Sequence, residues 1–235
     1  MWQIVKILDL SKEKKNIITS CKDDLNFIEK LFYTCSVTKL PPNLLRERDQ
    51  IFAYAKVSFD DKNPLHFRML TTIYRQLTDL KHCVRYGEHW EKIGFQGRDP
   101  ATDLRGVGML GILQMLAFIS LNFDFIKYVH SYSLDDIYHF PLAAGLLNIT
   151  EIMMQTLREG KLNNVILHQK SVINAVNAFY FAVFFKFFMM YKANKYTESD
   201  FGELTKTVAE LAKKNPGKLI ADYIKEKEVF CKANV

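Results

Sequence analysis

Hydrophobic side chains recur at intervals of three or four residues along almost the whole chain, and no alternating run is long enough to predict a strand. The pattern therefore predicts an all-α protein, a single compact bundle of about eight to ten helices. Helix starts are expected where proline or a capping side chain precedes an apolar stripe. Such starts occur at Pro41-Pro42-Asn43, Asn63-Pro64, Asp99-Pro100, Pro141, Ser199 and Asn215-Pro216-Gly217. Two further short helices are expected over residues 25–33 and 123–130.

Residues 164–191 form the longest apolar stretch, which is hydrophobic on nearly every side of a helix. We expect this helix at the centre of the bundle. Asn174, Asn177 and Lys186 interrupt the stretch. A membrane-spanning helix needs about 20 nearly uncharged apolar residues, and charged side chains inside hydrocarbon are strongly disfavoured. A buried core helix, and no integral membrane span, is therefore the interpretation we favour.

The chain has 235 residues and contains no stretch rich in Ser, Gly and Pro that would separate two domains. We expect one domain over residues 61–228. A helical lead-in of residues 1–60 is expected to pack on this domain, and residues 229–235 are expected to form a short tail. The pattern leaves the role of the lead-in open.

Charge and cysteine usage exclude several classes of function. The 32 Lys and Arg residues outnumber the 26 Asp and Glu residues, but the two signs alternate along the C-terminal helices, so no nucleic-acid partner is expected. The four cysteines form no CxxC pair and the six histidines form no HExxH motif, so we expect no metal site, no cofactor and no disulfide. A reducing, cytoplasmic setting without a secretory signal is the expected location.

The most unusual sequence lies in residues 90–111, which we interpret as an ordered loop followed by a helix start. Gly94 and Gly97 bracket Phe95-Gln96, so the backbone can adopt positive φ while Phe95 is buried and Gln96 is held outward. An equally weighted alternative is a turn in which Gln96 bonds its own backbone. Apolar residues at such spacing usually pack inward. The expected loop anchors are these apolar residues and the glycines around them, namely Trp90, Ile93, Gly94, Phe95, Gly97, Gly106 and Gly108.

Three acceptors mark the helix start in this segment. Asp99, Thr102 and Asp103 can accept hydrogen bonds from the free N–H groups of a first turn, and Pro100 suits the first helical position. The helix is expected to continue to about residue 121. This expected helix contains three glycines, each of which costs about 1 kcal/mol of helix stability relative to alanine. Glycine would be tolerated there if another backbone comes close. The three are Gly106, Gly108 and Gly111.

Arg105 follows this helix start closely, where the helix dipole disfavours a cation by about 0.3–1 kcal/mol. Another interaction should therefore stabilise the side chain there. From the residues alone, the favoured interpretation is a salt bridge to Asp99 or Asp103 that locks the loop. That interpretation gives Arg105 a structural role only.

A family resemblance changes the interpretation of this segment. The sequence Trp90-x-x-Ile93-Gly-Phe-Gln-Gly-x-Asp99-Pro-x-Thr102-Asp-Leu-Arg105-Gly-x-Gly108 resembles the signature of the ELMO domain family, and of its ELMOD branch in particular. The similarity covers roughly residues 65–224 and includes Asn148-Ile-Thr, Leu157-Arg158-Glu, Asn177-Ala-Phe-Tyr and Leu211-Ala-Lys-Lys-Asn-Pro. It is less clear before about residue 60, so it leaves the lead-in unexplained.

The resemblance implies an all-helical GTPase-activating protein for the GTP form of Arf/Arl small GTPases, which is an activator and not itself an enzyme. It implies that Arg105 is the essential residue, supplied to the partner's nucleotide site, with Asp103, Thr102 and Asp99 holding the loop. We also hypothesise that Gln96 aligns the attacking water or positions the partner's own glutamine. Peripheral attachment to endomembranes would then occur through the partner.

A non-catalytic function is the main alternative. Members of the family that serve as adaptors with DOCK-type exchange factors lack the arginine and the activity, so Arg105 places this chain with the activators. The alternative is an adaptor of the same fold, which binds a small GTPase or a DOCK-type scaffold without accelerating hydrolysis.

Overall fold

The computed structural model describes residues 38–234 and shows their side chains as far as residue 230. This part of the chain contains helices and turns but no strand, which confirms the all-α prediction. The predicted helix at residues 25–33 lies outside it. The α-helices are α3 (Pro42–Lys56), α4 (Pro64–Thr78), α5 (Gly108–Leu121), α6 (Phe123–Ser133), α7 (Leu142–Arg158), α8 (Asn163–Gln169), α9 (Val172–Ala193), α10 (Phe201–Lys214) and α11 (Pro216–Asn234). Residues 38–234 also contain three short 3₁₀ helices, η3 (Glu88–Ile93), η4 (Pro100–Gly106) and η5 (Glu198–Asp200).

Local capping sequences begin several of these helices where they were predicted. Asn63 caps α4, because its side chain accepts a hydrogen bond of 3.0 Å from the N–H of Leu65, and Pro64 occupies the first turn. Pro42 and Pro216 likewise stand at the first positions of α3 and α11, although no side chain caps the start of α3. These starts need only neighbouring residues, so the sequence alone predicts them.

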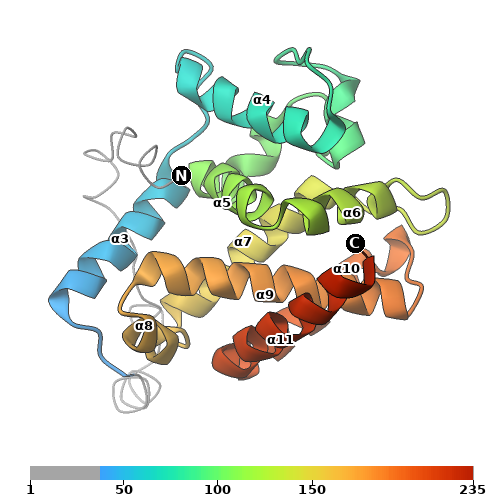
Figure 1. Ribbon diagram of the computed structural model, residues 1–235. Coiled ribbons are helices and arrows are strands. Elements are labelled where there is room, and N and C mark those ends of the chain that lie inside the picture. Colours follow the sequence, from blue (N-terminus) through green and yellow to red (C-terminus); the bar gives the residue numbers. More distant parts are fainter. Residues whose placement is uncertain (1–37, 235) are drawn as a thin grey trace.

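Helix α9 is the central element of the bundle (Figure 1), where it packs against α3, α5, α7, α8, α10 and α11. The prediction of one helix over residues 164–191 is wrong at its beginning, because α8 and α9 are separate helices. Lys170 adopts a left-handed conformation with φ of 53°, and the hydroxyl of Ser171 accepts a hydrogen bond from the N–H of Asn174. Ser171 therefore caps a new helix and interrupts the apolar stretch.

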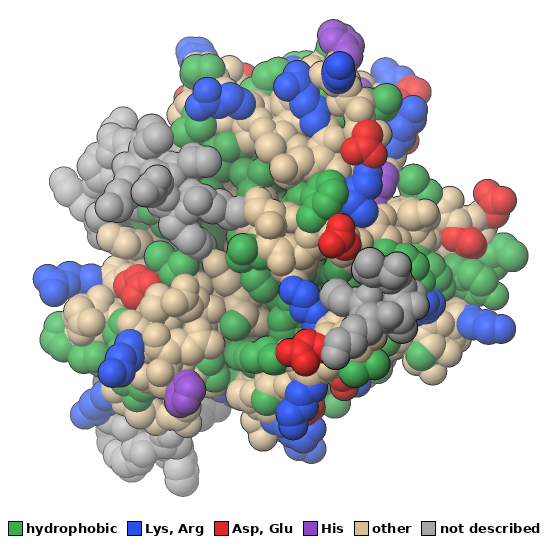
Figure 2. All heavy atoms as spheres, in the orientation of Figure 1, with side chains coloured by type: hydrophobic (Ala, Val, Ile, Leu, Met, Phe, Trp, Pro, Cys, Tyr) green, Lys and Arg blue, Asp and Glu red, His purple; other side chains and the backbone are tan. Residues whose placement is uncertain are grey.

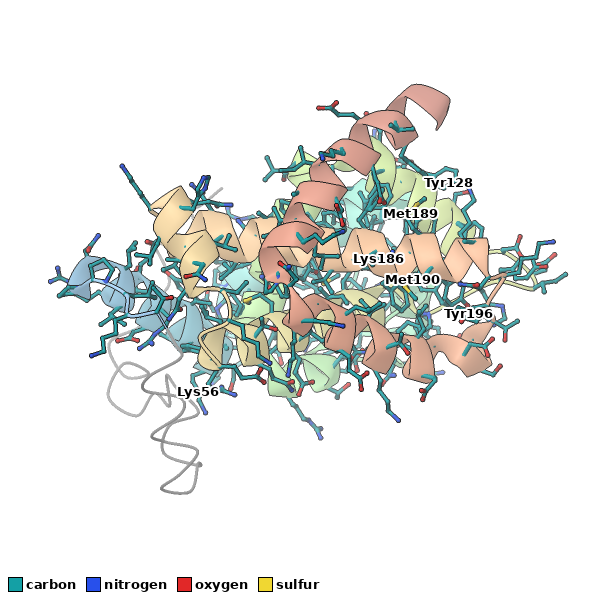
Figure 3. The ribbon with its side chains drawn as sticks, turned by 90° about the horizontal axis from the view of Figure 1, so that it is seen from below. Lys56, Tyr128, Lys186, Met189, Met190 and Tyr196 are labelled. Atoms are coloured by element: carbon teal, nitrogen blue, oxygen red, sulfur yellow. The ribbon has the colours of Figure 1, made fainter. Side chains whose placement is uncertain are left out.

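Burial of α9 against its neighbours accounts for its unusual hydrophobicity. The helix is long and apolar enough to cross a membrane by length and composition, but 72% of its most apolar window is buried inside the bundle. Its aromatic rings pack on those of other helices, as where Phe118 of α5 stacks on Phe181 with 5.1 Å between ring centroids. Lys186 of α9, labelled in Figure 3, is half-buried. It lines a small hollow with Asp222 and Glu226 of α11. Such burial is typical of a core helix.

The surface carries charges of both signs. On the face shown in Figure 2, Lys and Arg side chains are interspersed with Asp and Glu rather than gathered into one basic stripe. On α11, for example, Lys218 pairs with Asp222 at 2.6 Å, one helical turn away. This is the arrangement that the alternating C-terminal charges predict.

Candidate functional site

The segment before α5 turns sharply instead of forming one helix. The prediction of a single helix from Asp99-Pro100 to about residue 121 is wrong, because η4 and α5 meet at an angle of 106°. The N–H of Val107 bonds back to the carbonyl of Leu104, whereas the N–H of Met109 donates to the carbonyl of Val57, at 2.9 Å. A continuous helix would direct the Met109 N–H at residue 105. A contact with the chain beyond α3 therefore replaces the helical bond and turns the chain.

Gly108 allows this junction to form. Its φ is +53°, and a Cβ atom placed on it would lie 2.4 Å from the carbonyl oxygen of Ala55 and 2.6 Å from that of Val57. No larger residue fits between the junction and the end of α3 without movement of a backbone. A Cβ on Gly106, by contrast, meets no atom within 4 Å. The expected close backbone approach therefore occurs at Gly108 and not at Gly106.

Gly94 fixes the preceding loop to α7. Its φ is +85°, and a Cβ there would lie 2.1 Å from the backbone nitrogen of Leu142. The carbonyl of Gly94 also accepts a hydrogen bond of 3.0 Å from the N–H of Ala144, in the first turn of α7. Gly97 has φ of +88° with open space around it, so its role is conformational. These contacts hold the loop backbone against the body of the domain.

The predicted apolar anchors are all buried. Trp90 and Ile93 have no exposed surface, and Phe95 is 3% exposed. The Trp90 ring packs edge-on against Phe95 at 5.9 Å and against Tyr74 of α4 at 5.3 Å, and its indole N–H donates to the carbonyl of Arg85. The loop is therefore attached to the domain through its aromatic side chains.

Asp103 connects the two halves of the loop. Its carboxylate accepts a hydrogen bond of 2.7 Å from the N–H of Gln96 and another of 3.2 Å from the hydroxyl of Thr102. Burial raises the pKa of the Asp103 carboxyl, while these two hydrogen bonds act in the opposite direction. The side chain of Gln96 is exposed, with its backbone held in place by Asp103. The two residues are therefore coupled through the backbone.

Arg85, which the sequence analysis did not single out, is the arginine that locks the loop. Its guanidinium pairs with Asp99 at 2.8 Å and with Asp61, and lies 4.6 Å from the centre of the Phe59 ring. Hydrogen bonding from Arg85 is the largest cause of the lowered pKa of Asp61. Asp99 also caps η4 by accepting from the N–H of Ala101. A lone arginine in an aperiodic loop gives no sequence signal for such a role.

Arg105 lies exposed in the last turn of η4. Within the described part of the chain it forms no ion pair or hydrogen bond, because Asp99 is engaged by Arg85 and Asp103 by the loop. The expected salt bridge from Arg105 is therefore absent from residues 38–234. The prediction that the helix dipole disfavours Arg105 is also wrong for η4, because Arg105 lies at the carbonyl end of this helix, which favours a cation.

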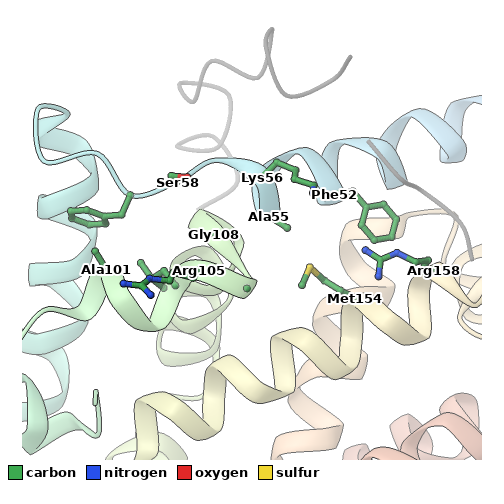
Figure 4. A pocket seen from close by; sticks show the side chains of 12 residues that line it. Phe52, Ala55, Lys56, Ser58, Ala101, Arg105, Gly108, Met154 and Arg158 are labelled. Atoms are coloured by element: carbon green, nitrogen blue, oxygen red, sulfur yellow. The ribbon is translucent and has the colours of Figure 1, made fainter. Parts of the chain in front are cut away.

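Arg105 lines a pocket of about 260 Å³ between η4, the end of α3 and α7 (Figure 4). We call this hollow the Arg105 pocket. Phe52, Ala55 and Lys56 of α3 form one wall, and Met154 and Arg158 of α7 form another. The sequence analysis missed this contribution of α3, which lies in the segment predicted as a lead-in. For Arg158 the only signal was its place in the resemblance to the family.

Gln96 does not share this pocket. Its side chain lines a separate hollow of about 580 Å³ with Gly97, residues 133–136, residues 139–141 and Glu198. The structure therefore places Gln96 and Arg105 on one loop but beside different hollows. Among residues 38–234, no group of three His, Cys, Asp or Glu side chains could hold a metal ion.

A buried histidine beside the Arg105 pocket predicts a pH dependence of stability. His66 is 2% exposed, packs on Phe59, and its Nδ1 accepts a hydrogen bond of 3.0 Å from the N–H of Asp60. Burial lowers the pKa of His66, against the attraction of the Asp60 carboxylate. Protonation of Nδ1 would also remove the acceptor, so the folded state favours the neutral ring.

The free energy of unfolding should therefore be retained above about pH 7 and fall as the pH drops below about 6.5, the ordinary pKa of histidine in an unfolded chain. His66→Asn keeps an acceptor but cannot bind the proton, so its loss of stability between pH 7 and pH 5 should be smaller than that of the wild type. Urea unfolding at both pH values measures the difference. The exposed His82→Asn variant serves as the control, and equal losses in wild type and His66→Asn would contradict this assignment.

Comparison with known proteins identifies the family of this fold. The model of the ELMO/CED-12 family matches residues 49–205. ELMO domain-containing protein 3 of Homo sapiens is 36% identical over 221 residues, covering 93% of this chain and 58% of the human protein. The Mus musculus protein of the same name is 38% identical over 192 residues, covering 79% of this chain and 50% of the relative. No solved structure matches the chain.

A more distant relative shows how far the similarity extends. ELMO domain-containing protein B of Dictyostelium discoideum is 27% identical over 141 residues, covering 60% of this chain and 49% of the relative. The chain therefore spans about half to three fifths of the length of these curated relatives. The resemblance read from residues 90–108 is confirmed, and the chain belongs to the ELMO/CED-12 family, in its branch of ELMO domain-containing proteins.

Proposed function

We propose that this chain stimulates GTP hydrolysis by a small GTPase of the Arf/Arl group, and that it does so by supplying Arg105 in trans. The observation that carries the proposal is the exposed guanidinium of Arg105, without an ion pair among the described residues, on a turn fixed at both sides. A cation used only to stabilise its own loop would be expected to pair with the nearby carboxylates. Those carboxylates are instead engaged by other groups.

The chemistry of GTP hydrolysis explains why one arginine suffices. Negative charge develops on the phosphoryl oxygens in the transition state, and the GTPase already supplies Mg²⁺, a P-loop lysine and a residue that orients water. The missing contribution is positive charge delivered in a fixed position. Arginine is permanently charged and its planar fork matches two phosphate oxygens, so it suits this task better than lysine.

The fixed position of the Arg105 turn supports the same conclusion. The turn is held by the Met109 bond to Val57, by the close fit of Gly108, and by the Asp103 bond to Gln96. Because the backbone of this turn is already fixed, little backbone entropy is lost when Arg105 enters a partner's site. Only the side chain of Arg105 then has to be ordered in a single rotamer.

Transition-state recognition tests the proposal. A panel of GTP-loaded Arf and Arl proteins is mixed with the chain, and single-turnover hydrolysis is measured together with binding to the GDP-aluminium fluoride form. We expect stimulation of at least one GTPase, and tighter binding to the aluminium fluoride form than to the GDP form. A chain that binds the GTP form and the GDP-aluminium fluoride form equally well, and does not accelerate hydrolysis, would instead be an adaptor.

Gln96 provides a second, independent test within the same loop. If it aligns the attacking water or the partner's glutamine, Gln96→Ala should lower the maximal rate of stimulated hydrolysis far more than it lowers the affinity. The variant should fold normally, because the side chain is exposed and only the backbone N–H bonds Asp103. Turnover equal to that of the wild type would exclude this role for Gln96. That result would agree with the position of Gln96, which lines a different hollow from Arg105.

A further inference from the structure

The hollow beside Gln96 has a mainly acidic lining. We call this hollow of about 580 Å³ the Gln96 hollow. Four of the described residues that line it are acidic, whereas one is a lysine, Lys92, and one is a histidine, His139. The acidic residues are Glu91, Asp135, Asp136 and Glu198. Even if His139, which lies 3.3 Å from Glu198, is protonated, the carboxylates outnumber the cations. Such a lining repels an anionic ligand and attracts a cationic one.

Three of these carboxylates are not paired with a cation of their own domain. Glu91 and Asp136 are exposed, and neither side chain forms an ion pair or hydrogen bond within the described part of the chain. Asp135 accepts hydrogen bonds of 2.9 Å from the N–H groups of Tyr138 and Ile137. These two bonds hold the pKa of Asp135 below its ordinary value, so its carboxylate stays ionised at neutral pH. The negative charge of the hollow is therefore available to a partner.

Two exposed apolar side chains border the hollow, on the loop between α6 and α7. Leu134 is 55% exposed and Ile137 is 63% exposed. Leu134 lines the hollow, and Ile137 lies between the lining stretches at residues 133–136 and 139–141. In Figure 1 this loop projects from the side of the bundle beyond α6, and Figure 2 shows hydrophobic and acidic side chains together at the same edge. Neighbouring apolar side chains that the domain itself does not bury are typical of a protein contact surface.

The Gln96 hollow is continuous with the Arg105 turn. The N–H of Gln96, at the edge of the hollow, donates to the carboxylate of Asp103 at 2.7 Å, and Asp103 lies two residues before Arg105. A stable protein interface covers about 800 Å² on each partner, which is far more than one side chain occupies. A GTPase that receives Arg105 is therefore placed to contact the Gln96 hollow as well.

We propose that the Gln96 hollow binds a lysine or arginine side chain of the same GTPase, with Leu134 and Ile137 packing on apolar groups beside it. This proposal rests on the proposed function, because it identifies a second contact of the partner that receives Arg105. A long cationic side chain fits both features of the surface, since its charged end reaches the carboxylates while its methylene groups lie against apolar side chains. An anionic membrane does not fit, because its negative surface repels the acidic lining.

One charge variant and one apolar variant test the two parts of this contact. We expect Asp136→Lys to raise the concentration of activator needed for half-maximal stimulation about tenfold, and this increase should shrink at high salt. Ile137→Ser should raise the same concentration about threefold, and salt should not reduce this increase because no charge is lost. Both variants should keep the wild-type maximal rate, since Arg105 and its turn are unchanged. Direct binding to the GTP-loaded GTPase should show the same losses of affinity.

Helix α10 offers a matched pair of control residues outside the hollow. Glu210 is exposed and Leu211 is 43% exposed, so the two adjacent residues repeat the combination of acidic and apolar side chains at Asp136 and Ile137. Glu210→Lys and Leu211→Ser should behave as the wild type. Thermal unfolding checks that every variant folds. Asp136→Asn, which removes the charge without adding another, replaces Asp136→Lys if the charge reversal folds poorly, and its smaller increase should also shrink at high salt.

Different failures give different results in this experiment. A wild-type half-maximal concentration for either the charge variant or Ile137→Ser, or equal increases in the α10 controls, would overturn the docking proposal and leave the proposed function standing. Weaker self-association of the variants in sedimentation, with unchanged affinity for the GTPase, would assign the loop to a second copy of the chain and overturn the proposal too. A wild type that binds the GTPase without stimulating it would overturn the proposed function, and the variants' binding affinities would then still test the hollow. Absence of both binding and stimulation would overturn both proposals.

Discussion

Arg105→Ala is expected to lower the maximal rate of stimulated GTP hydrolysis about a thousandfold or more, because an arginine supplied in trans is worth roughly 10³–10⁵ in rate. The free energy of unfolding should change by less than about 0.5 kcal/mol, since the side chain is exposed and forms no bond within residues 38–234. Affinity for the GTP-loaded partner should fall much less than the rate. Single-turnover hydrolysis at saturating activator measures the first effect, and direct binding measures the second.

Two further variants distinguish charge, geometry and general surface effects. Arg105→Lys keeps the charge but loses the planar fork, so it should recover only a small part of the rate. Arg98→Ala removes another exposed arginine from the same loop, one that pairs with Glu88 on the surface, and it should retain the wild-type rate. Full stimulation by Arg105→Lys, or an equal loss in Arg98→Ala, would contradict the assignment of Arg105.

Gly108→Ala is expected to destabilise the protein by roughly 2–4 kcal/mol, because alanine combines an unfavourable positive φ with a clash against the carbonyl oxygens of Ala55, in α3, and of Val57, directly after it. Relief of this clash requires the η4–α5 junction to move away from Ala55 and Val57. The Arg105 turn moves with it, so the maximal rate should also fall. Urea unfolding and single-turnover hydrolysis measure the two effects.

Gly106→Ala is the matched control, two residues earlier in the chain. A Cβ at this position meets no atom within 4 Å and its φ is not positive, so the stability should change by less than about 0.5 kcal/mol. The contrast between the two glycines isolates the contact with α3 from the general effect of glycine on the unfolded chain. Equal destabilisation by both substitutions would show that the close approach at Gly108 has no special importance.

The elements that the sequence predicts well are those set by neighbouring residues. Asn63-Pro64 and Asn215-Pro216 fix helix ends through caps and proline geometry, and both were predicted. The long apolar stretch predicts a central helix for the same reason. Its break at Ser171 was missed, because a run of hydrophobic residues conceals a single capping side chain.

The features that the sequence does not predict depend on residues far apart in the chain. The turn at Gly108 exists because the N–H of Met109 bonds Val57, about fifty residues earlier. The ion pairs of Arg85 join it to Asp61 and Asp99, which lie 24 and 14 residues away in the chain. No periodicity records such contacts, so residues 90–111 predict which side chains are unusual but not which of them pair. The placement of Gln96 and Arg105 in two different hollows likewise depends on contacts between distant residues, so the sequence does not predict it.

The contact between Val57 and Met109 also bears on where the functional unit begins. A shortened protein starting at residue 61, the boundary drawn from the sequence, would lose the acceptor for the Met109 N–H, the carbonyl groups that Gly108 approaches, and the wall of the Arg105 pocket formed by α3. Its aromatic core around α9 would keep most of its partners, so such a fragment could remain helical. The smallest fragment able to present Arg105 as described therefore includes α3 and begins before Pro42.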